Sequence, residues 1–331
     1  MSFDLNPWRM SVAPMMAWTD RHCRMLHRQI TQHTLLYTEM ITSSALIHGD
    51  VPKHLRFEAI EHPVALQLGG SEPADLAVAA RMAQAWGYDE VNLNCGCPSE
   101  RVQKGAFGAC LMLEPQTVAD CVKAMRDAVN IEVTVKHRIG IGREESYGFV
   151  RDFVGRVSEA GCRVFIVHAR NAWLEGLSPK DNREIPPLRY EMAHQLKRDF
   201  PHLMIAVNGG LVSNEQIQEQ LQQVDGVMVG RAAYHTPLIM QDWDHLYFGQ
   251  AHRSLNIDAV EATMVEYMER ENRLYATPWH SIATHMLGLR HGQAGARAWR
   301  RVWSDHRLYR EPARLVWQEA TKARESATVS V

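Results

Sequence analysis

The chain has 331 residues, 46% of them hydrophobic and 22% charged, so it can bury a sizeable core, in one large domain and a smaller one or in two medium domains. No window reaches eighteen apolar residues, and the start MSFDLNPWRM lacks the parts of a secretory signal. We therefore expect a cytoplasmic protein with no membrane partner. The formal net charge of −2 gives no global sign of a polyanionic partner.

Six cysteines are spread along the chain, which is not the density of a secreted domain held together by disulfides. We expect them to be reduced. Cys95 and Cys97 have no second cysteine pair at the spacing of a zinc site, so no metal is expected.

Eight short runs rich in Val, Ile and Leu recur along the chain, as expected for parallel strands buried on both faces. They are Ser11–Met15, Leu35–Met40, Pro63–Gly69, Glu90–Cys95, Glu132–Arg138, Arg163–Ala169, Leu203–Gly209 and Gly226–Gly230. Segments with helical spacing lie between them, such as Ala74–Trp86, Pro115–Val129 and Gly148–Ala160.

This alternation predicts an α/β fold, a (β/α)8 TIM barrel, better than it predicts a doubly wound sheet. The nearest approach to a dinucleotide fingerprint, Gly140–Glu145, lacks the third glycine. Strand signals stop after Pro237, and helical spacing follows with many Arg, Trp and His residues. We predict a catalytic barrel over residues 1–242 and a smaller all-helical C-terminal domain over 243–331.

The C-terminal end is locally basic. Arg290–Val331 contains nine basic and four acidic residues, a local charge of +5. Such a face can meet phosphates, although a solvated helix face is the common alternative.

Barrel enzymes carry their working groups at the C-terminal ends of strands, and these ends are unusually polar here. Asn208-Gly209-Gly210 and Gly230-Arg231 end the seventh and eighth strands, where barrels often bind phosphate. Lys136 lies in an apolar strand and needs an ion pair, a Schiff base or the edge of a cofactor. Together these ends suit a ligand with a heteroaromatic ring and a phosphate.

Two further strand residues fit the same ligand. Gln67 offers a donor and an acceptor to the imide edge of a pyrimidine-like ring. His168 can donate to a phosphate or a substrate carbonyl, or can be a core histidine that a backbone carbonyl satisfies.

The segment VNLNCGCP, residues 91–98, separates two cysteines by their position on a strand. With a period of two, Cys95 shares the apolar face, and Asn92 and Asn94 share the other. We therefore predict that Cys95 is a small buried hydrophobe. Cys97 falls in the following loop above the barrel mouth, where it can donate a proton or remain an inert loop thiol.

Ordered motifs along nearly the whole chain resemble those of the tRNA-dihydrouridine synthases, flavoproteins that reduce uridine in tRNA. These motifs are APM (13–15), QLGG (67–70), NLNCGCP (92–98), RVQKGAFGA (101–109), VK (135–136), HAR (168–170), NGG (208–210) and GR (230–231). Three more are similar to the A-type subfamily, which acts on D-loop positions 20 and 20a: LLYTEM (35–40), WLEGLSPKDNREIPPL (173–188) and GARAWRR (295–301).

The resemblance implies bound FMN, NADPH as the reductant, and Cys97 as the donor of a proton to C5 of uracil while hydride goes to C6. It implies that FMN contacts Pro14, Met15, Met16, Gln67, Lys136, His168, Asn208, Gly209, Gly210, Gly230 and Arg231. It implies tRNA as the partner, rather than DNA, with contacts from Asn94, Lys180, Arg183, Arg297 and Arg300. We expect a monomer.

Three other functions stay open at this point. A small-molecule FMN barrel oxidoreductase of the dihydroorotate-dehydrogenase type would use the same phosphate site but would not need a basic helical tail. An RNA-binding protein without catalysis would be colourless. An aldolase would form a Schiff base on Lys136.

Overall fold

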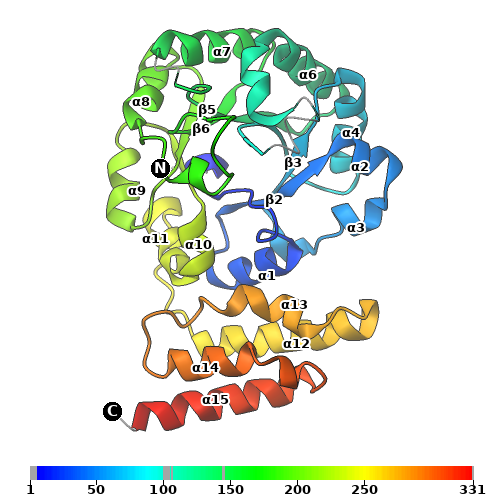
Figure 1. The fold of residues 1–331 in the computed structure, drawn as a ribbon, viewed down its shortest axis with the longest axis vertical. Helices are drawn as coiled ribbons and strands as arrows, with labels where there is room; N and C mark the ends of the chain where they lie inside the picture. The colour runs from blue at the N-terminus through cyan, green and yellow to red at the C-terminus, as the bar shows by residue number, and fades with distance from the viewer. Residues whose placement is uncertain (1–5, 100–104, 106, 144–145, 330–331) are drawn as a thin grey trace. The chain divides into compact units, whose positions relative to one another are not determined.

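Eight parallel strands close into a barrel in the order in which they occur in the sequence (Figure 1). The computed structural model describes residues 6–99, 105, 107–143 and 146–329; the motif residues Arg101–Lys104 and Ala106 lie outside this part. The strands are β1 Met10–Val12, β2 Leu35–Thr42, β3 Val64–Gly69, β4 Glu90–Cys95, β5 Glu132–Arg138, β6 Val164–His168, β7 Met204–Asn208 and β8 Gly226–Val229. The predicted TIM barrel is confirmed.

Helices connect successive strands, as a parallel barrel requires. They include α2 Ser43–His48, α3 Val51–Leu55, α4 Pro73–Ala85, α6 Pro115–Ala128, α7 Tyr147–Glu159, α8 Tyr190–Asp199 and α9 Asn214–Gln220, with 3-10 turns η1 Pro7–Arg9, η2 Ala59–Glu61, η3 Gly108–Leu113 and η4 Asp181–Arg183. Helices α4 and α6 begin with proline, which suits the first turn because that N–H has no helical partner. Helix α4 buries Leu76, Ala79, Ala80 and Ala83 at helical spacing, as predicted.

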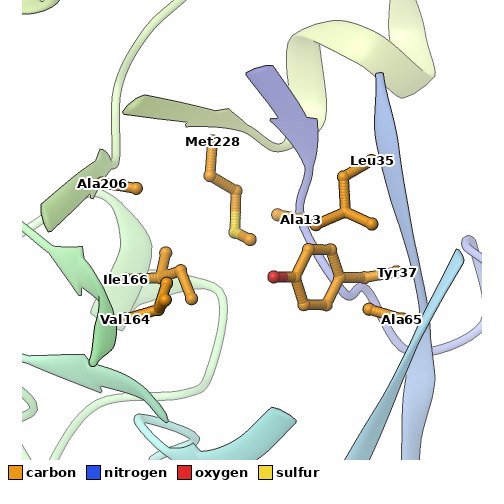
Figure 2. Packing of buried hydrophobic residues seen from close by; sticks show 8 residues of the cluster. All are labelled: Ala13, Leu35, Tyr37, Ala65, Val164, Ile166, Ala206 and Met228. Carbon is orange, nitrogen blue, oxygen red and sulfur yellow. The ribbon is translucent and has the colours of Figure 1, made fainter. Parts of the chain in front are cut away.

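The barrel interior has an apolar part and a polar part. The apolar part comprises Ala13, Leu35, Tyr37, Ala65, Val164, Ile166, Ala206 and Met228, whose side chains face one another across the barrel in Figure 2. Strands β3 to β5 instead contribute polar side chains at alternate positions, namely Gln67, Glu90, Asn92, Asn94, Thr134 and Lys136. Buried polar groups are tolerated only when they are hydrogen-bonded, so this part must be internally connected.

Strand β1 is shorter at its C-terminal end than the predicted run to Met15. The following loop is fixed by side chains: the Met15 N–H donates to Thr19 Oγ1 over 2.9 Å and the Ala17 N–H donates to Glu39 Oε1 over 2.5 Å. Ala17 has a φ of 63°, which is outside the strand region. The chain therefore leaves the barrel wall before the first predicted ligand residues.

A second compact unit is entirely helical among its described residues and combines residues 20–32 with 231–329, while 6–19 and 33–230 form the first unit. Its helices are α1 Arg21–Ile30, α10 Arg231–His235, α11 Trp243–Phe248, α12 Ile257–Tyr275, α13 Trp279–Ala283, α14 Ala296–Trp303 and α15 Ala313–Val329, with η5 Pro237–Met240, η6 Thr284–Met286 and η7 His306–Leu308. The predicted helical C-terminal region is confirmed. The boundary at residue 242 stays a prediction.

Helix α1 is held in this second unit by long-range hydrogen bonds. The His22 Nδ1 and Tyr267 hydroxyl lie 2.7 Å apart. Arg253 donates to the Ile30 carbonyl over 2.9 Å, just before Thr31 donates to Asp244 over 2.7 Å. Neither α1 nor any other helix in the described residues is long and apolar enough to cross a membrane.

Candidate active site at the barrel mouth

The loop after β4 carries the half-buried thiol of Cys97. The Asn94 side-chain oxygen accepts hydrogen bonds from the Gly96 N–H over 3.1 Å and the Cys97 N–H over 3.0 Å. The Cys97 carbonyl accepts a third bond from the Ala109 N–H over 2.9 Å. Strand β4 therefore holds the turn that presents this thiol.

Cys95 lies on the face of β4 opposite to Asn94 and is completely buried, as the alternation of side chains predicted. Burial raises the pKa of its thiol well above the usual value, so it stays protonated and unreactive. Cys95 and Cys97 are both free thiols. Of the two, Cys97 is the one available for chemistry.

Gln67 and Asn94 are joined at the upper end of the polar interior. Asn94 Nδ2 donates to Gln67 Oε1 over 2.8 Å, and Gln67 Nε2 donates to Asn92 Oδ1 over 2.7 Å. An amide has two N–H groups and an oxygen with two lone pairs, so these contacts use only part of its capacity. Gln67 can thus be oriented by the barrel and still bond to a ligand.

Lys136 on β5 and His168 on β6 lie near the guanidinium groups of Arg138, Arg170 and Arg183. Burial first, and then Arg138, lowers the pKa of Lys136 to about 7, while Cys97 opposes that shift. Burial, Arg138 and Lys136 hold the pKa of His168 well below its usual value, so its imidazole is neutral at pH 7. Such a cluster suits an anionic ligand.

Arg138, at the end of β5, is a functional candidate that sequence reasoning did not select. Its guanidinium is buried and donates to three carbonyls: Gly96 over 2.9 Å, Asn171 over 2.8 Å and Asn182 over 2.9 Å. Burial lowers its pKa to about 10, and Cys97 opposes this shift. Arg138 thereby joins the Cys97 loop to the loop after β6. The position of Arg138 at the C-terminal end of a predicted strand could have identified it as a functional candidate.

Gly209 and Gly210 follow β7 with φ values of 118° and 70°, which favour glycine. A Cβ on Gly209 would lie 2.7 Å from His168 Cδ2, and one on Gly210 would lie 2.5 Å from Leu188 Cδ1. Tyr190 donates to the Gly209 carbonyl over 2.5 Å. Only glycine fits this turn, which leaves its backbone open to close approach.

The other predicted ligand residues have varied surroundings. Asn208 donates to the Met228 carbonyl over 2.8 Å, so its side-chain amide links β7 to β8. Gly230 would make only ordinary contacts with an added Cβ, and Arg231 begins α10 in the second unit. Pro14 and Met15 are partly buried and Met16 is 60% exposed in the loop after β1.

The loop after β6 carries exposed Lys180 and Arg183 on either side of a buried asparagine. Asn182 accepts from the Trp173 N–H over 2.8 Å and donates to the Trp173 carbonyl over 2.9 Å. This internal anchor defines the shape of the loop and leaves both cations at its surface.

Helix α14 separates apolar from basic residues. Ala296, Trp299 and Trp303 are buried, whereas Arg297 and Arg300 are exposed. Other basic residues nearby are engaged in ion pairs, namely Arg290, Arg307, Arg314 and Arg324. Within the part of the chain that the structure describes, no ion pair involves Arg297, Arg300, Arg301 or Arg310. These four arginines are available to external phosphates.

Comparison with protein-family models matches residues 11–325 to the family described as Dihydrouridine synthase (Dus). The chain belongs to the dihydrouridine synthase family. This membership confirms the resemblance that the ordered motifs indicated.

Curated relatives include tRNA-dihydrouridine(20/20a) synthase of Pseudomonas aeruginosa, 57% identical over 296 residues that cover 89% of each chain. The protein of the same name in Escherichia coli K12 is 56% identical over 299 residues, covering 90% of this chain and 86% of the relative. A solved structure of 2-naphthoyl-CoA reductase with 2-naphthoyl-CoA aligns with a TM-score of 0.54 at 12% identity, covering 71% of this chain and 49% of that chain. The last similarity supports the fold alone.

Proposed function

We propose that this dihydrouridine synthase reduces the C5=C6 bond of uridine at D-loop positions 20 and 20a of tRNA, with bound FMN, NADPH as the reductant and Cys97 as the proton donor. The proposal is supported by relatives of that printed name at 56–57% identity. The observation that carries the chemistry is the half-buried Cys97 thiol in a loop anchored to β4, next to a cationic barrel mouth.

The residues at the mouth fit FMN. The turn at Gly209 and Gly210 has no room for a Cβ, as expected where backbone amides approach a phosphate. We infer that Gly230, Arg231, Lys136 and His168 complete the polar contacts. Pro14, Met15, Met16, Gln67 and Asn208 would complete the binding site. When bound, FMN supplies the hydride that C6 of uracil receives.

The protein's own groups position the base and move the proton. We infer that Cys97 gives its proton to C5, and that Asn94 holds the edge of the uracil with its remaining hydrogen-bonding capacity. Uridine must leave its stack to reach a thiol in this loop. Arg138 keeps the loop in place through the Gly96 carbonyl.

Affinity for tRNA would come from exposed cations. Lys180, Arg183, Arg297 and Arg300 are all exposed and suited to phosphate contacts, which fix register and make binding salt-dependent. A basic helical surface of this kind favours tRNA over the small-molecule alternative. We also infer a monomeric enzyme located with its tRNA substrate in the cytoplasm.

The test is to map dihydrouridine in tRNA from cells that lack this protein. We expect the modification to be missing at positions 20 and 20a and to be restored by the wild-type gene but not by Cys97→Ala. Unchanged modification at both positions would contradict the assigned substrate. A colourless purified protein would contradict the assigned cofactor.

A further inference from the structure

A continuous chain of hydrogen bonds runs through the polar part of the barrel interior. Starting from the Cys97 loop, it passes along Asn94, Gln67 and Asn92 with donor–acceptor distances of 2.8 and 2.7 Å. Asn92 Nδ2 then donates to Thr134 Oγ1 over 2.7 Å, and Thr134 donates to Glu90 Oε1 over 2.5 Å. Three neighbouring strands, β3, β4 and β5, contribute these side chains in register.

Groups at both ends of this hydrogen-bond chain determine which side chain donates and which accepts at each step. At the loop end, the Gly96 and Cys97 N–H groups can only donate, so the oxygen of Asn94 must face them and its nitrogen must face Gln67. The same constraint passes to Gln67 and then to Asn92. Thr134 accepts from Asn92, so its single proton is directed to Glu90.

Glu90 is the acceptor at the other end. It is 2% exposed, and its second oxygen accepts from the Trp8 indole N–H over 2.6 Å. Tyr37 donates to Oε1 over 2.6 Å, and burial together with Glu90 keeps the pKa of Tyr37 well above its usual value, so that hydroxyl retains its proton. Burial raises the pKa of Glu90, and the hydrogen bonds from Thr134, Tyr37 and Trp8 oppose that shift. Because donors face both of its oxygens, Glu90 is the acceptor for all three neighbours.

We propose that Thr134 and Glu90, deep in the barrel, are positioning residues that set the amide orientations of Asn92, Gln67 and Asn94 and thereby the place of the Cys97 thiol. The inference rests on the proposed role of Cys97. An amide reversed anywhere along the chain would put two donors or two acceptors face to face, and such a conflict in a low-dielectric core is costly. Through this hydrogen-bond chain, the buried Glu90 determines how the side chain of Asn94 is oriented at the mouth of the barrel.

The decisive variant is Thr134→Val, which keeps the side-chain volume and removes the hydroxyl. We expect kcat for tRNA reduction to fall about 10- to 100-fold, the usual effect of a misplaced reacting group, with KM for tRNA unchanged. Flavin reduction by NADPH should fall less than tRNA reduction, because Cys97 takes no part in that half-reaction and Gln67 is the one member of the hydrogen-bond chain that also belongs to the proposed FMN site. Thr134→Ser restores the hydroxyl and should recover kcat to within about threefold of the wild type.

The matched control is Tyr37→Phe. It also removes one hydrogen bond to Glu90 but leaves the path from Thr134 to Cys97 complete. We expect it to lower the melting temperature without lowering kcat. Equal losses of kcat in Thr134→Val and Tyr37→Phe would mean that the core acts only through general stability, and would overturn the proposal.

A second readout is independent of turnover. The rate at which iodoacetamide alkylates Cys97, followed by peptide mass spectrometry, should change about threefold or more in Thr134→Val and should not change in Tyr37→Phe, because only the first releases the loop anchor. Glu90→Met, which leaves no acceptor for the Thr134 hydroxyl, should reproduce the Thr134→Val result and serves if that variant does not fold. An unchanged alkylation rate in both would overturn the proposal.

Different results would contradict the role of Cys97 as proton donor and the role of Thr134 as a positioning residue. If Cys97→Ala retains normal tRNA reduction, the proposed proton donor is wrong. If Cys97→Ala is inactive while Thr134→Val keeps wild-type kcat and alkylation, the donor stands and the positioning chain is wrong.

Discussion

At the scale of single residues, the period of two along β4 separates Cys95 from Cys97. It predicted that Cys95 faces the core and Cys97 does not, and the structure has Cys95 fully buried and Cys97 half-buried in the loop. The same period linked Asn92 with Asn94, but it did not extend to Thr134 on the next strand. Register between strands is a long-range property, so the hydrogen-bond chain was not predictable from one segment.

The two cysteines therefore make a matched test. Cys97→Ala should lower tRNA reduction by about 10²- to 10⁴-fold, the usual contribution of a general acid, and should leave flavin reduction by NADPH intact. Cys95→Ala should leave kcat near the wild-type value and lower only stability, because it removes a buried sulfur. Single-turnover measurement of each half-reaction distinguishes them. Equal losses of tRNA reduction would contradict the separate roles.

Lys136 predicts a pH dependence of stability. Its pKa is about 7 in the folded protein and near 10.5 when exposed, so the unfolded chain binds more protons between these values and stability rises with pH there. Below pH 7 the full penalty of the half-buried ammonium is present. In flavin-free protein at pH 6, Lys136→Met should therefore raise the free energy of unfolding by ~1–3 kcal/mol, the range seen when buried charges are replaced.

Thermal unfolding between pH 6 and pH 10 checks this prediction. The difference between Lys136→Met and wild type should shrink as the pH rises, because wild-type Lys136 then loses its charge. Lys123→Met, which removes an exposed lysine of α6, is the control and should show no such trend. A pH-independent difference for Lys136→Met would show that packing, and not charge, is responsible.

At the scale of elements, helical spacing predicted the bounds of those helices that bury one face. Helices α4, α6 and α7 begin and end within one residue of their predicted bounds. In α14 the buried tryptophans alternate with arginines, and the structure identifies which arginines lack ion partners among the described residues, which composition alone did not. Charge pairs such as Arg314 with Glu269 join different helices, so they appear only in the folded chain.

Helix α14 accordingly predicts a difference between exposed arginines. If Arg300 makes the proposed phosphate contact, Arg300→Ala should weaken tRNA binding and lower the salt slope of log Kd by about one. Arg314→Ala, whose guanidinium is already paired with Glu269 over 3.2 Å, should change the slope much less. Binding titrations at several salt concentrations measure both slopes. Equal slopes for Arg300→Ala and the wild type would contradict the proposed contact between Arg300 of α14 and tRNA.

At the scale of the whole molecule, the sequence predicted a barrel followed by helices but not which helices pack together. Helix α1 follows the first barrel strand in sequence, yet it belongs to the compact unit that contains residues 231–329. Its hydrogen bonds to Tyr267, Asp244 and Arg253 cross more than 200 positions of sequence. Local patterns carry no information about contacts of this range.

This arrangement predicts the behaviour of a truncated chain. A fragment of residues 1–242 keeps α1 and its neighbour η5 but loses Asp244, Arg253 and Tyr267. Part of the buried face of α1 is then uncovered, and hydrogen bonds at both of its ends are lost. We expect this fragment to lose cooperative thermal unfolding or to aggregate, because exposed apolar helix faces promote association. Circular dichroism during heating measures the transition. In the full chain, Tyr267→Phe removes the bond to His22 and should cost ~1 kcal/mol, the usual worth of one hydrogen bond. If the fragment unfolded cooperatively at the full-length temperature, α1 would not depend on the second unit. Loss of tRNA reduction by the fragment would then report on substrate binding alone.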